Sequence, residues 1–221
     1  MATEATNNLR SVLSQMGKAA ENYESTEPLE DAEAPKGVTS TEAADPDSEP
    51  VATTHKPTDF ASDKIVDLLN QQYTKEMFSS EKYKGMAAYM DDLGLKGFAA
   101  YFNKQAVDEA AHAMMFRNFV VDSLNKPFKM DSIDAISLSY ANPAAVFEEQ
   151  LAHEKEVSAS IKIIGKVCFE EGNLFVIPFV QGMLVEQLEE EDRCYTDLLR
   201  VRMAGDGAGL VGMDRELGDI E

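Results

Sequence analysis

Apolar residues recur at helical spacing through four long segments of this chain. The segments cover roughly residues 60–92, 98–125, 143–172 and 174–204. In each segment the apolar residues follow steps of three and four, which places them along one face of an α-helix. Four amphipathic helices of this length have to bury their apolar faces against one another. The sequence therefore predicts an all-α fold.

The connections between the segments predict how the helices are arranged. Gly94 and Gly97 lie in a short turn after the first segment, and Gly172 lies in the turn after the third. Short turns of this kind join antiparallel neighbours. Some sixteen residues without helical period separate the second segment from the third, and at 3.3 Å per residue they span about 53 Å. A helix of 30 residues is only about 45 Å long, so we expect a long four-helix bundle with one long crossover connection. A loose surface loop is the alternative for this connection.

Composition divides the chain into three parts. The first 57 residues hold five of the eight prolines and eleven acidic against four basic residues, with one aromatic residue. Such a segment has too little apolar surface to offset the entropy of ordering it. We therefore expect an acidic disordered extension over residues 1–59, the bundle over residues 60–204, and a short C-terminal helix with a tail over residues 205–221. Pro178, just inside the fourth segment, predicts a bend there.

The charge and the cysteine content exclude several classes of protein. A formal net charge of −20 repels nucleic acid and anionic membrane surfaces and attracts cations. No apolar run reaches the roughly 20 residues of a membrane-spanning helix. Cys168 and Cys194 show no CxxC spacing, which favours reduced thiols. We expect a cytoplasmic protein; an organelle such as a plastid is the alternative if the extension is processed, although its acidity is not typical of a transit peptide.

One acidic residue lies near the middle of every apolar stripe. The four are Glu76, Glu109, Glu154 and Glu190. His112 follows Glu109 by one helical turn on the same face. Four buried carboxylates would repel one another or take up protons unless concentrated positive charge lay between them. Two divalent cations supply that charge, and inward carboxylates with a Glu-x-x-His motif are typical of di-metal helical bundles, with iron or manganese as the preferred ion.

Each of these residues also has an ordinary structural interpretation. A lone Glu-x-x-His is a weak motif, and Glu76 alone is compatible with a solvated face. Most of the acidic run at residues 186–192 is interpreted as solvated, and Tyr83 as a core tyrosine with a hydrogen-bonded hydroxyl. His153 points about 100° away from the stripe by helical periodicity and is left out. Only the coincidence of all four helices favours a metal site.

At these residues the chain resembles the non-haem ferritins of the bacterial type. The similarity extends from about residue 63 to residue 217. It is carried by NQQYTKEMFSSEKY, GMAAYMDDLGLKGFAAYF, QAVDEAAHAM, AHEKEV and VEQLEEE, and by MAGDGAG before DRELG. The resemblance implies the ferritin-like bundle.

The resemblance also implies a di-iron ferroxidase centre. One iron is expected to be bound by Glu76, Glu109 and His112. The other is expected to be bound by Glu109, which bridges the two, together with Glu154 and Glu190.

Further residues follow from the same resemblance. Tyr83 and Gln187 are expected to stand beside the di-iron centre as part of the catalytic set. A possible third iron site corresponds to Asp108, Glu186 and Glu189. Asp108 departs from the family pattern there, since a longer glutamate is usual.

Haem is not expected. Bacterioferritins hold haem with a methionine directly after the glutamate of the first motif, and they carry a second Glu-x-x-His on the fourth helix. Ala110 and the run Glu186-Gln-Leu-Glu189 occupy those positions here. A tryptophan common near the site in this branch is also absent, and Gly182 stands in its place.

The resemblance implies that the chain oxidises Fe²⁺ with O₂ or H₂O₂ and stores the ferric product inside a shell of 24 subunits. Another di-iron oxidase or peroxidase is one alternative, although such proteins usually carry two Glu-x-x-His motifs. A structural shell subunit is the other alternative, although such subunits lose inward ligands that this chain keeps.

Overall fold

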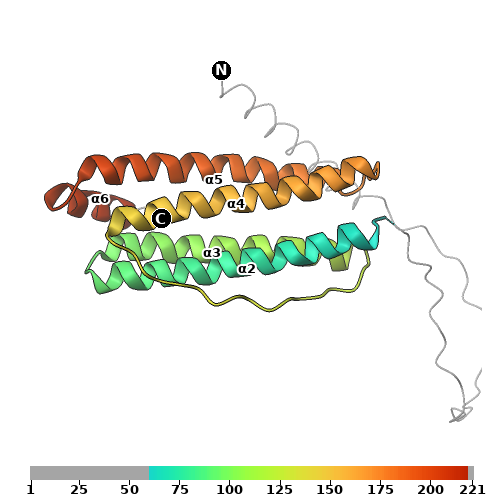
Figure 1. Cartoon of the computed structure of the whole chain (residues 1–221), viewed down its shortest axis with the longest axis horizontal. Helices are drawn as coiled ribbons and strands as arrows, with labels where there is room; N and C mark the ends of the chain where they lie inside the picture. The colour runs from blue at the N-terminus through green and yellow to red at the C-terminus, as the bar shows by residue number, and fades with distance from the viewer. Residues whose placement is uncertain (1–59, 219–221) are drawn as a thin grey trace, which may run out of the picture. The chain divides into compact units, whose positions relative to one another are not determined.

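The computed structural model of the chain describes residues 60–218. In this part the helices are α2 (Asp63–Asp92), α3 (Lys96–Asn118), α4 (Pro143–Glu170), α5 (Ile177–Ala204) and α6 (Ala208–Gly218), and a π-helical turn, η1 (Phe119–Ser123), continues α3. Helix α2 packs along α3, α4 packs along α5, and the two pairs lie side by side (Figure 1). The four-helix bundle and the short C-terminal helix are thereby confirmed. The expected disordered extension lies outside the described residues.

The helix ends follow local capping chemistry. Ser62 accepts a hydrogen bond from the backbone N–H of Ile65 at 3.2 Å at the start of α2. Asn142 caps α4 in the same way, and a proline follows it in the first turn. Gly94 and Gly172 adopt positive φ angles of 78° and 64°, which glycine tolerates without steric cost. Gly94 and Gly172 lie in the two short turns that make α2–α3 and α4–α5 antiparallel hairpins, and Ser62 and Asn142 begin the first helix of each hairpin.

Two local features differ from the sequence-based expectation. The last turn of the second segment is π-helical, with Leu124 N–H bonded to the Phe119 carbonyl at 3.0 Å. This wider turn accompanies a stacked contact between the rings of Phe119 and Phe179, 4.1 Å apart. The bend expected at Pro178 assumed a helix that begins near residue 174. Helix α5 begins at Ile177, only one residue before Pro178, so the proline lies in its first turn. A proline in the first turn interrupts no hydrogen bond of the helix.

The crossover lies against the bundle and is not a loose loop. It runs along α2 from the end of η1 to the start of α4 (Figure 1). Near its beginning the backbone N–H of Lys129 donates to Asn70 Oδ1 at 3.3 Å, and near its end the hydroxyl of Tyr89 donates to the carbonyl of Tyr140 at 3.3 Å. Both Asn70 and Tyr89 belong to α2. The crossover therefore spans the bundle as the segment length predicted.

Helix α6 folds back onto the start of α3. Asp214 Oδ1 accepts a hydrogen bond from the backbone N–H of Phe98 at 2.8 Å, so it caps α3 from the far end of the chain. A Cβ atom at Gly97 would lie 1.6 Å from the carbonyl oxygen of Asp214. Only a glycine at position 97 permits this close approach.

The apolar core is divided into two clusters along the bundle. One cluster surrounds Phe98, Phe102 and Phe147, and the other surrounds Leu69 and Ile161. Between them, residues 70–82 of α2, 109–112 of α3, 150–158 of α4 and 187–191 of α5 contribute buried polar and charged side chains. Among the described residues no helix combines the length and the apolarity of a membrane-spanning segment. A polar layer between two apolar clusters is therefore the principal internal feature of the bundle.

Candidate metal centre

The polar layer contains the five residues that were predicted from the sequence to be metal ligands. The exposed fraction is 1% for Glu76, 2% for Glu109 and Glu154, 4% for Glu190 and 9% for His112. Each of the four long helices supplies one of the carboxylates. Acidic residues are rarely buried to this extent without a compensating partner. The layer therefore needs positive charge or protons.

Three ligand atoms in this layer lie close enough to hold one ion. One atom each of Glu109, His112 and Glu190 lie within 4.8 Å of one another, and all three residues are buried. His112 Nδ1 is 3.7 Å from Glu109 Oε2. Side chains from α3 and α5 thus converge on this group across the bundle.

Glu154 is held by two hydrogen bonds from other helices. The hydroxyl of Tyr83 on α2 donates to Glu154 Oε1. The side-chain amide of Gln187 on α5 donates to Glu154 Oε2 at 3.0 Å. The two residues predicted to stand beside the metal centre therefore both contact one candidate ligand.

Glu76 and Glu190 each accept one hydrogen bond from a nitrogen donor. Gln72 donates to Glu76 Oε1 at 2.9 Å, and Arg193 donates to Glu190 Oε1 at 3.3 Å. The second oxygen of each carboxylate, Oε2, is buried and has no hydrogen-bond partner. Neither partner was predicted from the sequence, although their spacings of four and three residues from the glutamates place them on the same helical face.

Burial and mutual repulsion change the acidity of the layer. The pKa of Glu76 lies well above its usual value because of burial and the neighbouring charge of Glu109. Burial, with the charges of Glu154 and Glu190, raises the pKa of Glu109 to about 9. The pKa of Glu190 rises to about 7, again mainly through burial. Without a cation, part of the layer therefore carries protons at neutral pH.

The donor set fits a divalent metal ion such as iron or manganese. Carboxylate oxygens with one imidazole suit Fe or Mn, and two buried oxygens lack any other partner. A divalent cation at the centre would satisfy these oxygens and favour the charged form of each carboxylate. The polar layer is therefore suited to bind metal and is costly without it.

The residues expected to form a third iron site are spread over the surface of the layer. Asp108 is half-buried, whereas Glu186 and Glu189 are exposed. Asp108 and Glu186 line different pockets, which lie on opposite sides of the Glu109–His112–Glu190 group along the bundle.

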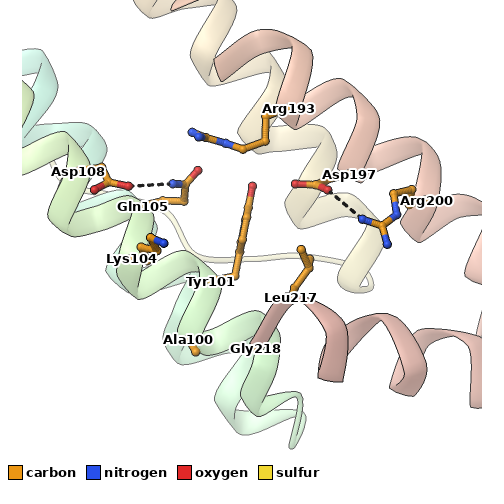
Figure 2. Close-up of a pocket in the computed structure, with 10 residues that line it drawn as sticks. All are labelled: Ala100, Tyr101, Lys104, Gln105, Asp108, Arg193, Asp197, Arg200, Leu217 and Gly218. Carbon is orange, nitrogen blue, oxygen red and sulfur yellow. Dashed lines mark hydrogen bonds and ion pairs between the residues drawn. The ribbon is translucent and has the colours of Figure 1, made fainter. Parts of the chain in front are cut away.

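Figure 2 shows the pocket that contains Asp108, with a volume of about 220 Å³, between α3, α5 and α6. Gln105 donates to Asp108 at 3.4 Å, and Arg193 reaches over the pocket from α5. Because Arg193 also contacts Glu190, this pocket lies directly beside the candidate centre.

His153 is buried, although helical periodicity had placed it away from the apolar stripe of its helix. It is 6% exposed, and its Nε2 atom lies 2.7 Å from the Ser79 hydroxyl of α2. Burial and the charge of Lys82 lower its pKa to about 4, so it is neutral. The single apolar stripe assumed for α4 was too narrow, because α4 packs against α2 as well as α5.

The sequence of the chain is similar to those of known proteins. The sequence model of a family described as "Ferritin-like domain" matches residues 66–203. A bacterial non-heme ferritin of Bacteroides fragilis is 31% identical over 157 residues, which cover 71% of this chain and 98% of the relative. One from Staphylococcus aureus is 27% identical over 71% of this chain and 95% of its own length.

Solved structures give the same similarity. A ferritin of Archaeoglobus fulgidus engineered into a closed form superposes with a TM-score of 0.71 at 31% identity, covering 73% of this chain and 98% of its own. The open-pore ferritin of the same archaeon superposes with a TM-score of 0.71 at 29% identity, covering 73% of this chain and 99% of its own.

Proposed function

Because this chain belongs to the family of bacterial non-haem ferritins, with a ferritin-like domain over residues 66–203, we propose that it is an iron-storage protein and a ferroxidase. Fe²⁺ is its substrate, O₂ or H₂O₂ is the oxidant, and the ferric product is stored. The observation that carries the proposal is the polar layer, in which four helices each bury one carboxylate and Glu109 and Glu190 converge on His112.

In this proposal the layer binds two iron ions. Glu76, Glu109 and His112 bind one ion, and Glu109 bridges to a second ion bound by Glu154 and Glu190. The short distances among Glu109, His112 and Glu190 support a shared centre. Hard anionic oxygens stabilise Fe³⁺ more than Fe²⁺ and so favour the loss of one electron from each ion.

Tyr83 and Gln187 have a positioning role. Their hydrogen bonds occupy both oxygens of Glu154 before any metal arrives. Such bonds orient a ligand and limit the conformations that it has to give up on binding metal.

The remaining parts of the proposal follow the family. We propose a shell of 24 subunits in the cytoplasm, or in an organelle such as a plastid if the extension is processed, without haem. The third iron site at Asp108, Glu186 and Glu189 stays a prediction, as does the division of the chain into residues 1–59, 60–204 and 205–221.

Oxidation of added Fe²⁺, followed by stopped-flow absorbance, tests the ferroxidase. We expect Glu109→Gln and His112→Ala to lose more activity than the 10- to 100-fold that loss of an outer partner of a metal ligand costs. Glu156→Gln is the matched control, because Glu156 is exposed on α4 only two residues from Glu154. Equal rates in all the variants and the unchanged protein would refute the proposal.

A further inference from the structure

A second pocket, of about 360 Å³, opens between α3 and α5 on the other side of the candidate centre. Most of its wall is apolar, formed by Met115, Pro178, Phe179 and Met183. Two polar side chains complete it. His112 joins the pocket to the metal centre, and Glu186 lines it as an exposed carboxylate.

Gly182 borders this pocket from the interior of α5, where glycine disfavours the helix relative to other residues. Two usual reasons for a helical glycine do not apply here. Its φ angle is not positive, and a Cβ atom at this position would meet nothing within 4 Å. The structural effect of its missing side chain is open space beside His112.

The pocket has the properties of a site for a small organic molecule. Its volume and its apolar walls with few polar groups are typical of ligand pockets. Two methionine sulfur atoms and the ring of Phe179 favour a planar aromatic guest. The Glu186 carboxylate accepts hydrogen bonds from hydroxyl groups. The net charge of −20 disfavours anionic guests, and a phenolic molecule supplies the hydroxyl donors that the Glu186 carboxylate accepts.

We propose that this pocket binds a neutral aromatic diol of the hydroquinone class, which returns stored Fe³⁺ to Fe²⁺ at the adjacent centre. The reaction rests on the proposed storage function, whereas the binding site does not. One hydroquinone loses two electrons and its two hydroxyl protons and becomes a quinone. Two Fe³⁺ ions gain one electron each, and the two protons pass to solvent.

Binding is tested first, on the full chain without metal. Hydroquinone is titrated anaerobically by calorimetry into the unchanged protein, Gly182→Leu and Gln181→Leu. A Cβ atom at position 182 meets nothing within 4 Å, so leucine is expected to occupy the pocket and to weaken binding roughly tenfold, as when about 1.4 kcal/mol is lost. Gln181 is exposed, does not line the pocket, and receives the same side chain as a control. Equal affinity in all three proteins would overturn the site.

Reduction is tested on ferric-loaded protein. Release of Fe²⁺ to a chelator is followed with hydroquinone and, separately, with dithionite. Gly182→Leu is expected to slow hydroquinone-driven release by roughly tenfold and to leave dithionite-driven release unchanged. Equal hydroquinone-driven release in Gly182→Leu and the unchanged protein contradicts the reductive role.

Failure of the unchanged protein to oxidise and store iron contradicts the proposed function instead. The binding titration still decides whether the pocket accepts the diol in that case.

Discussion

At the scale of single residues, Glu154 differs from Glu76 and Glu190 because both of its oxygens are hydrogen-bonded. Tyr83 and Gln187 fix its carboxylate, whereas Glu76 and Glu190 each keep one buried oxygen without a partner. The layer therefore combines one pre-positioned ligand with two that each keep an oxygen free for a cation or a proton. This difference leads to separate predictions for Glu154 and for the titrating carboxylates.

Tyr83→Phe is expected to weaken the metal site that uses Glu154 while leaving the fold intact. The change removes one hydrogen bond to Glu154 and keeps the buried ring. Loss of an outer partner lowers metal affinity by roughly tenfold or more. Titration with Co²⁺, followed by its visible spectrum, measures the affinity. Tyr195→Phe is the control, because Tyr195 is 52% exposed on α5. A Co²⁺ affinity unchanged in Tyr83→Phe would contradict the positioning role.

The metal-free protein is expected to lose stability as pH rises from about 5 to about 9. An unfolded glutamate releases its proton near pH 4.5, whereas folded Glu190 keeps its proton to about pH 7 and Glu109 to about pH 9. Over that window the folded state binds more protons, so the free energy of unfolding falls as pH rises, by about 1.4 kcal/mol per unit of pKa shift. Melting temperatures from circular dichroism across this range provide the measurement.

Two comparisons separate this effect from general charge repulsion. Glu190→Gln removes one titrating group and is expected to flatten the fall between pH 5 and 7. Added Co²⁺ replaces the protons and is expected to raise stability most at the high end of the range. If neither Glu190→Gln nor Co²⁺ alters the fall of the melting temperature with pH, the polar layer is not the cause of that fall.

The candidate ligands could be predicted from the sequence because helical phase determines which side chains face inward. Glu76, Glu109, Glu154 and Glu190 fall on stripes whose apolar members are buried in the structure. The position of His153 could not be predicted in this way. A helix that packs against two neighbours buries more than one stripe, and the second neighbour is known only from the fold.

At the scale of elements, the helix boundaries followed from residues that act locally. Capping at Ser62 and Asn142 and the glycine turns at Gly94 and Gly172 depend only on nearby backbone groups. The π-helical turn η1 accompanies instead a long-range contact, in which Phe119 stacks on Phe179 of α5. Such a contact leaves no local signal, which explains why the sequence predicted an ordinary α-helical end.

Gly97→Ala is expected to loosen the attachment of α6. The added methyl group collides with the Asp214 backbone and weakens the cap that Asp214 places on α3. Overpacking of this kind typically costs about 1–3 kcal/mol. Amide hydrogen exchange in α6 and the melting temperature measure the change. Gly212→Ala is the matched control within α6, because a Cβ there meets nothing within 4 Å, and it is expected to be neutral or slightly stabilising. Equal effects of the two substitutions would show that close packing at Gly97 is not needed.

At the scale of the whole molecule, residues 60–218 contain both apolar clusters and every candidate ligand. We therefore expect deletion of residues 1–57 to leave assembly and Fe²⁺ oxidation intact. Size-exclusion chromatography with light scattering measures the mass before and after iron loading. The proposed particle near 24 chains is expected for both forms, and loss of the cage on deletion would contradict this prediction.

The polar layer is divided equally between the two helical hairpins. Glu76 and Glu109 belong to α2–α3, and Glu154 and Glu190 belong to α4–α5. Contacts within each hairpin are local in sequence and form quickly, whereas contacts between the hairpins require closure of the long crossover. We therefore expect the candidate metal centre to be complete only when the two hairpins have closed on each other. A bound cation is then expected to slow the separation of the hairpins and so to lengthen the lifetime of the native bundle.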